Sequence, residues 1–150
     1  MSQSITVPSV GSRIADIDLV SADGALTTLG AVRANQRTVV FFLRASSCAI
    51  CLGHATAIHA MAAAGELGDA LVVLVTPGDA AQAARASARL NGAAVFASGD
   101  EHAEVGLGKF LAIQHSGTFL VAADGSVLYS KTSTLPMGSF SKPELVAALG

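Results

Sequence analysis

Two cysteines, Cys48 and Cys51, stand three positions apart in a chain of 150 residues that has no other cysteine. At this spacing in the first turn of a helix, two thiols can close a disulfide without a large backbone movement. The unpaired N–H groups and the positive end of the helix dipole stabilise a thiolate at the first of the two positions. We therefore expect Cys48 to be the nucleophile and Cys51, one turn further in, to be the more covered resolving thiol.

The same two thiols allow other interpretations. Cysteine also packs in protein cores as a small apolar residue. A structural zinc site needs four ligands, and His54 and His59 are the nearest imidazoles, but neither a second CxxC nor a paired histidine motif follows. A CxxC beside a βαβ pattern favours redox chemistry.

The elements that would position the cysteines form such a pattern. Residues 38–43 (TVVFFL) are apolar without alternation, which predicts a central strand covered on both faces. From Cys48 the apolar positions follow a helical period toward Gly65, with Ser46 and Ser47 as the expected N-cap residues. Residues 70–76 predict a second central strand, and residues 77–90 an alanine-rich helix.

The rest of the chain predicts shorter elements around this unit. Hairpins are expected at residues 16–29 and 118–130, each turning at an Asp-Gly pair, with a short strand at 93–98 and helices at 100–111 and 141–149. Together these elements predict an α/β fold in which a mixed central sheet is flanked by helices and preceded by an N-terminal β-hairpin. Residues 1–9 are expected to be a flexible arm and residues 10–150 one domain.

The composition of the chain argues against several classes of function and location. Nine basic and eleven acidic residues give a net charge of −2, without a basic cluster, so nucleic acid is not an expected partner. The apolar stretches are too short to span a membrane, no signal peptide is recognisable, and two cysteines do not make a disulfide-stapled scaffold, which together predict a cytoplasmic protein. Charged residues make up only 13% of the chain, which allows a self-associating face and hence a homodimer.

Three stretches resemble the AhpC/TSA group of peroxiredoxin-like proteins, which are thioredoxin-like redoxins. Residues 10–19 (VGSRIADIDL) are similar to the VGxxAPDFxL segment of that family. Residues 39–51 (VVFFLRASSCAIC) are similar to its FxRxxxCxxC strand-to-helix segment. Residues 117–125 (GTFLVAADG) resemble its (P/A)TFxxDxxG hairpin. The resemblance implies a thioredoxin-like fold for residues 10–150.

The resemblance also implies a function. The expected protein is a thiol-dependent oxidoreductase that reduces peroxides or protein disulfides in an antioxidant or redox-homeostasis role. It would use no cofactor and would be reduced by a thiol donor such as a thioredoxin or glutathione system. Arg44 would polarise a peroxide or stabilise the Cys48 thiolate, and the expected substrate contacts are Ser46, Ser47, Gly117 and Thr118.

The chain departs from the family pattern near the cysteines. Phe41 and Ala45 stand where peroxiredoxins have a proline and a threonine or serine, and Gly117 replaces the proline that faces the dithiol in thioredoxins. Two further hypotheses therefore stay open. One is a copper- or other metal-binding redoxin, with His102 or His115 as an added ligand, and the other is a non-catalytic interaction protein of the same fold.

Overall fold

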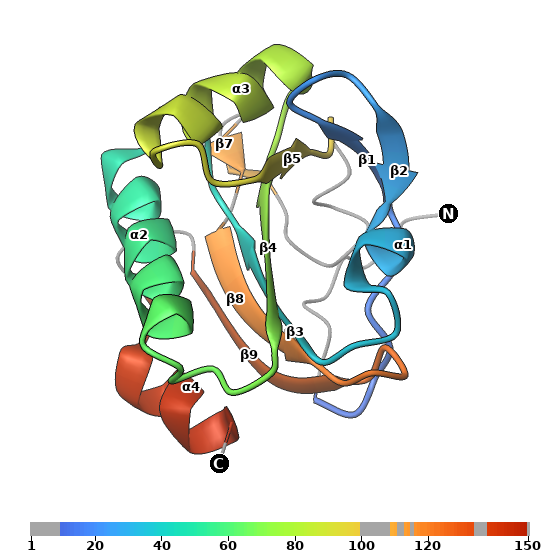
Figure 1. Cartoon of the computed structure of the whole chain (residues 1–150), viewed down its shortest axis with the longest axis vertical. Helices are drawn as coiled ribbons and strands as arrows, with labels where there is room; N and C mark the ends of the chain where they lie inside the picture. The colour runs from blue at the N-terminus through green and yellow to red at the C-terminus, as the bar shows by residue number, and fades with distance from the viewer. Residues whose placement is uncertain (1–9, 100–108, 111–112, 115, 134–137, 150) are drawn as a thin grey trace.

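The computed structural model of the chain describes residues 10–99, 109–110, 113–114, 116–133 and 138–149. A seven-stranded sheet in the order β2-β1-β5-β4-β3-β8-β9 forms its centre, and helices lie on both faces (Figure 1). The strands of this sheet are β1 (Asp18–Ser21), β2 (Leu26–Thr28), β3 (Thr38–Phe42), β4 (Leu71–Thr76), β5 (Val95–Ala97), β8 (Ser116–Val121) and β9 (Val127–Ser133). The described helices are α1 (Leu29–Arg33), α2 (Ala49–Ala63), α3 (Ala80–Arg89) and α4 (Lys142–Leu149).

Strand β3 is the structural centre of the molecule. All five of its residues are buried, and it pairs in parallel with β4 and antiparallel with β8. Strand β4 in turn pairs in parallel with β5, whereas the hairpins β1–β2 and β8–β9 are antiparallel. The predicted mixed sheet, its two central strands and both hairpins are thereby confirmed.

The two faces of the sheet bury separate apolar clusters, because side chains alternate along each strand. Val39 and Phe41 of β3 pack beneath α2, α3 and α4, together with both cysteines. Val40 and Phe42 pack on the other face, against α1 and the segment that precedes β1. The dithiol therefore belongs to the face that three helices cover.

Polar contacts attach helix α4 to strand β9 and to the loop after α2. The Tyr129 hydroxyl donates a hydrogen bond to Glu144 at 3.0 Å, and the Lys131 ammonium lies 3.4 Å from the same carboxylate. Lys142 lies 3.3 Å from Glu66, in the loop after α2. The helix begins after Ser141, whose hydroxyl accepts from the Glu144 N–H, as the serine-capped helix predicted at 141–149 requires.

The structure differs from the sequence prediction at two places. A short helix, α1, follows β2 directly, with the Thr28 hydroxyl accepting from the Ala31 N–H as its N-cap. The second difference concerns the helix predicted at 100–111, of which 100–108 and 111 lie outside the described residues. Its remaining residues, Lys109–Phe110, form strand β6, which pairs with β7 (Ile113–Gln114). Backbone pairing with β7 prevails over a helical pattern that two glycines weaken.

The arm predicted at residues 1–9 also lies outside the described residues. None of the helices in the described part of the chain has the length and apolar character needed to cross a membrane.

Candidate active site

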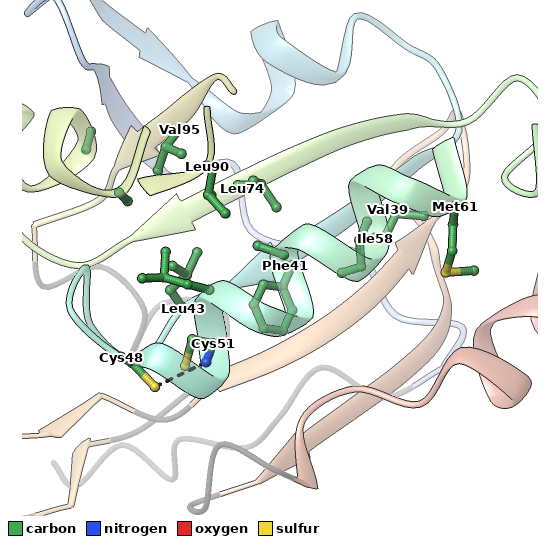
Figure 2. Packing of buried hydrophobic residues seen from close by; sticks show 14 of the residues in the cluster. Val39, Phe41, Leu43, Cys48, Cys51, Ile58, Met61, Leu74, Leu90 and Val95 are labelled. Carbon is green, nitrogen blue, oxygen red and sulfur yellow. Dashed lines mark hydrogen bonds between the residues drawn. The ribbon is translucent and has the colours of Figure 1, made fainter. Parts of the chain in front are cut away.

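Cys48 stands at the junction where the chain leaves β3 and enters α2. It is the N-cap of α2 itself, with an extended backbone, and its sulfur accepts the backbone N–H of Cys51 at 3.3 Å (Figure 2). An N-cap acceptor satisfies one of the N–H groups that the first turn of a helix leaves unpaired. The Cys48 sulfur is therefore held against the positive end of the α2 dipole, the position in which a thiolate is stabilised.

This arrangement corrects the prediction that Ser46 and Ser47 cap the helix. The Cys48 N–H donates to the Ala45 carbonyl at 3.2 Å, so the chain makes a tight turn over Ala45–Cys48 before α2 begins. This turn carries both serines away from the first helical N–H groups. Ser47 is exposed, and Ser46 is buried and bonded elsewhere.

Cys51 is the more deeply buried of the two cysteines. None of its surface is exposed, compared with 7% for Cys48, and its sulfur accepts the backbone N–H of Arg44 at 3.3 Å. Burial raises the pKa of the Cys51 thiol to about 12, the neighbouring Cys48 sulfur adds to the rise, and the Arg44 N–H opposes it. Both thiols are free, and the more covered thiol is the one expected from the spacing.

Arg44 is half-buried directly after β3. Its backbone contacts Cys51, as described above, and its side-chain Nε is buried with no hydrogen-bond partner among the described residues. Because a guanidinium nitrogen without a partner is costly to bury, a substrate oxygen or an anion at this place would be bound favourably. The predicted action of Arg44 on Cys48 stays a prediction.

Gly117 and Thr118 lie within β8 rather than in an open loop. Gly117 is paired with Phe42 on one side and Thr132 on the other. Thr118 is 1% exposed, and its hydroxyl donates to the Ser139 carbonyl at 2.7 Å. The structure thus places both residues in the sheet beside the end of β3, with the Thr118 hydroxyl already engaged.

Sequence reasoning missed Gln82 in the first turn of α3. The Ser46 hydroxyl donates a hydrogen bond to the Gln82 Oε1 at 2.6 Å, which joins the loop before Cys48 to a second helix. One signal was available, because the carboxyl ends of the parallel strands β3 and β4 lie at the same edge of the sheet. The helices that follow them, α2 and α3, must therefore begin near one another.

The candidate metal ligands are placed differently. His54 packs its ring on Phe41 and Phe140, with centroids 6.0 and 5.3 Å apart. His59 lies more than one turn further along α2, and its Nε2 is buried without a described partner. His102 and His115 lie outside the described residues, and within the described part no group of three or more His, Cys, Asp or Glu side chains could hold a metal ion.

A mixed sheet with helices on both faces, and a pair of thiols where its central strand enters a helix, define the thioredoxin-like class of thiol proteins. The chain belongs to the Redoxin family, whose model matches residues 9–149. The predicted resemblance to peroxiredoxin-like redoxins is thereby confirmed.

Solved structures of other proteins share this fold. The peroxidoxin BcpB from Mycobacterium tuberculosis is 19% identical, with a TM-score of 0.79 over 95% of this chain and 96% of that chain. A peroxiredoxin-like protein from Aquifex aeolicus is 15% identical, with a TM-score of 0.79 over 95% and 86%. Reduced Prx3 from Vibrio vulnificus, in complex with hydrogen peroxide, is 17% identical, with a TM-score of 0.74 over 95% and 99%. No curated protein matches the sequence. The fold prediction is confirmed.

Proposed function

We propose that this redoxin is a thiol peroxidase in which Cys48 attacks the peroxide and Cys51 resolves the product. The observation that carries the proposal is the contact between the Cys48 sulfur and the backbone N–H of Cys51 at the start of α2. A hydrogen bond of this kind strengthens when the sulfur becomes a thiolate, because its acceptor is then charged. The thiolate is the form that attacks an O–O bond.

The reaction uses the two thiols in turn. The Cys48 thiolate attacks one oxygen of a hydroperoxide, an S–O bond forms as the O–O bond breaks, and the leaving oxygen takes a proton from solvent to give an alcohol or water. Cys48 is then a sulfenic acid. The Cys51 sulfur attacks the Cys48 sulfur, an S–S bond forms, and the leaving hydroxide takes the Cys51 proton as water. An external thiol donor reduces the disulfide and returns both thiols.

The exposure of the two thiols favours a small substrate. Only 7% of Cys48 is exposed, and Cys51 is fully covered. A hydroperoxide has few heavy atoms and can approach a sulfur through a narrow opening. The disulfide of a folded protein must instead align both of its sulfurs with the nucleophile, for which the exposed surface of Cys48 is small. The hydrogen peroxide complex reported for the Vibrio vulnificus relative supports the same choice.

The proposed contacts to peroxide come from the loop that precedes Cys48. Arg44 offers a guanidinium whose Nε has no partner among the described residues, and the exposed Ser47 offers a hydroxyl next to Cys48. These two groups would take the place of the threonine or serine hydroxyl that peroxiredoxins have at the position of Ala45. Ser46, Gly117 and Thr118 would support the site from within, since their polar groups are bonded to the protein.

The reductant and the assembly are proposed on general grounds. A disulfide of this type needs a thiol donor such as a thioredoxin or glutathione system. A cytoplasmic location would supply such donors. A homodimer would cover part of a surface that has few charges.

The proposal is tested by mixing the reduced protein rapidly with hydrogen peroxide and, separately, with insulin. We expect Cys48 to be oxidised much faster than free glutathione, and the wild type to end as a Cys48–Cys51 disulfide that mass spectrometry detects. Cys48→Ser should abolish oxidation. Cys51→Ser should be oxidised once and stop at a sulfenic acid that dimedone traps.

Three results would contradict the assignment. One is oxidation of Cys48 by peroxide no faster than that of glutathione. Another is peroxide turnover in Cys48→Ser equal to that of the wild type. Faster reduction of insulin than of peroxide would also contradict it, and would identify a protein-disulfide reductase instead.

A further inference from the structure

The loop that carries Cys48, residues 44–48, forms hydrogen bonds within itself and with the first turn of α2. The Arg44 N–H donates to Cys51, the Cys48 N–H donates to Ala45, and the Cys51 N–H donates to Cys48. These three bonds join the loop to the first turn of α2. Ser46 and Ser47, in the middle of the loop, take no part in these three bonds.

Among the described residues, the hydrogen bond between Ser46 and Gln82 ties this loop to another element. The Ser46 hydroxyl donates to the Gln82 Oε1 at 2.6 Å; 7% of Ser46 is exposed and Gln82 is half-buried, so the bond is partly shielded from water. Gln82 lies 36 positions later in the chain, on α3. A shielded side-chain bond between two elements limits their relative movement more than a solvated one.

The Gln82 side chain is itself held in place. Asp79, the N-cap of α3, accepts the backbone N–H of Gln82 at 3.3 Å, which fixes its position in the first turn. Gly78 has a φ of +103°, and a Cβ at that position would lie 2.5 Å from the Gln82 Cγ. The glycine therefore leaves the space through which the Gln82 side chain passes toward Ser46.

We propose that Gln82 is a positioning residue for the nucleophile. By holding Ser46 it fixes the loop, and with it the distance between the Cys48 sulfur and the N–H groups at the start of α2. This inference takes Cys48 as the reactive thiol from the proposed function, but it does not depend on what the thiol attacks. A misplacement of about 1 Å at a reacting group is enough to reduce reactivity strongly.

The test measures the reactivity of Cys48 directly. A Cys51→Ala background leaves one thiol, so the rate of iodoacetamide alkylation at neutral pH reports the reactivity of Cys48 alone. In this background we compare Gln82→Met, which keeps the length of the side chain and removes its acceptor, Ser46→Ala, and the two together. Gln36→Met is the matched control, since Gln36 is exposed in the turn before β3.

We expect Gln82→Met to slow alkylation of Cys48 at neutral pH by roughly threefold to tenfold, the effect of about one hydrogen bond. Ser46→Ala should do the same, and the double variant should be no slower than the slower single variant, because both changes remove one interaction. Gln36→Met should match the parent. Melting temperatures confirm that each variant is folded.

The proposal is wrong if Cys48 in folded Gln82→Met is alkylated at the same rate as in its parent. Additive effects of the two changes would also overturn it, since they would show that Ser46 and Gln82 act separately. If the wild type does not turn over peroxide, only the proposed function is contradicted, because alkylation of Cys48 requires no peroxide.

Discussion

Cys51 donates its backbone N–H to the sulfur of Cys48 over 3.3 Å. One residue is thus expected to serve the reaction twice, holding the nucleophile with its backbone and resolving the product with its side chain. The two contributions can be separated, because a side-chain substitution leaves the N–H in place.

The backbone contribution is tested by comparing Cys51→Ala with Cys51→Pro. Cys51 is the third residue of α2, where the backbone N–H has no partner within the helix, so proline removes the N–H that contacts Cys48 without breaking a helical hydrogen bond. We expect Cys48 in Cys51→Pro to be alkylated roughly tenfold more slowly at pH 7 than in Cys51→Ala, the effect of a hydrogen bond to a charged acceptor. Both variants lack the Cys51 thiol, so the difference between them reports the N–H alone. Equal alkylation rates in two folded variants would show that the contact does not stabilise the thiolate.

The resolving thiol should be almost inert at neutral pH. Burial is the main cause that raises its pKa to about 12, and burial remains when Cys48 is replaced. In Cys48→Ser, alkylation of Cys51 should therefore be slow at pH 7 and rise about tenfold per pH unit to well above pH 9, since the raised pKa lies above this range. Reduced glutathione is the reference. A plateau near pH 9 would contradict the predicted effect of burial.

Ser116→Ala should leave the protein as stable as the wild type or more stable. Ser116 is fully buried, and its hydroxyl has no hydrogen-bond partner among the described residues. Alanine removes this polar group without enlarging the side chain, so the free energy of unfolding should rise by up to about 1 kcal/mol. Urea denaturation measures the change. Thr118→Val is the control and should destabilise, because it removes the buried hydrogen bond that the Thr118 hydroxyl donates to the Ser139 carbonyl.

Tyr129 reports on the attachment of α4 to the sheet. It is the one tyrosine of a chain without tryptophan, so ultraviolet titration observes a single phenol. Burial raises its pKa above the usual value of 10.0, and the hydrogen bond to Glu144 and the charge of that carboxylate raise it further. Glu144→Gln should therefore lower the pKa of Tyr129 toward, but not to, its usual value.

A matched change nearby serves as the control for this titration. Lys142 pairs with Glu66 rather than with Glu144, and Lys142→Met should leave the titration of Tyr129 unchanged. If Glu144→Gln titrates like the wild type, Glu144 does not influence the phenol in solution.

Local patterns in the sequence determined the main elements and the chemistry. The unbroken apolar run at β3 predicted a strand covered on both faces, and the spacing of Cys48 and Cys51 predicted which thiol is covered. Such properties follow from residues close together in the chain, because alternation, helical period and helix ends are local. They did not predict α1, whose five residues are too few to show a period.

The surroundings of the thiols were decided by the tertiary structure. Which residue caps α2 depended on the turn at Ala45, and the fate of the Ser46 hydroxyl depended on Gln82, which comes close only because β3 and β4 run in parallel. The raised pKa of Cys51 likewise depends on the burial of its side chain in the protein interior. The sequence by itself thus determined that the protein carries a dithiol at a helix start. Packing between distant segments determined how that dithiol is held, because hydrogen bonds and desolvation act through space.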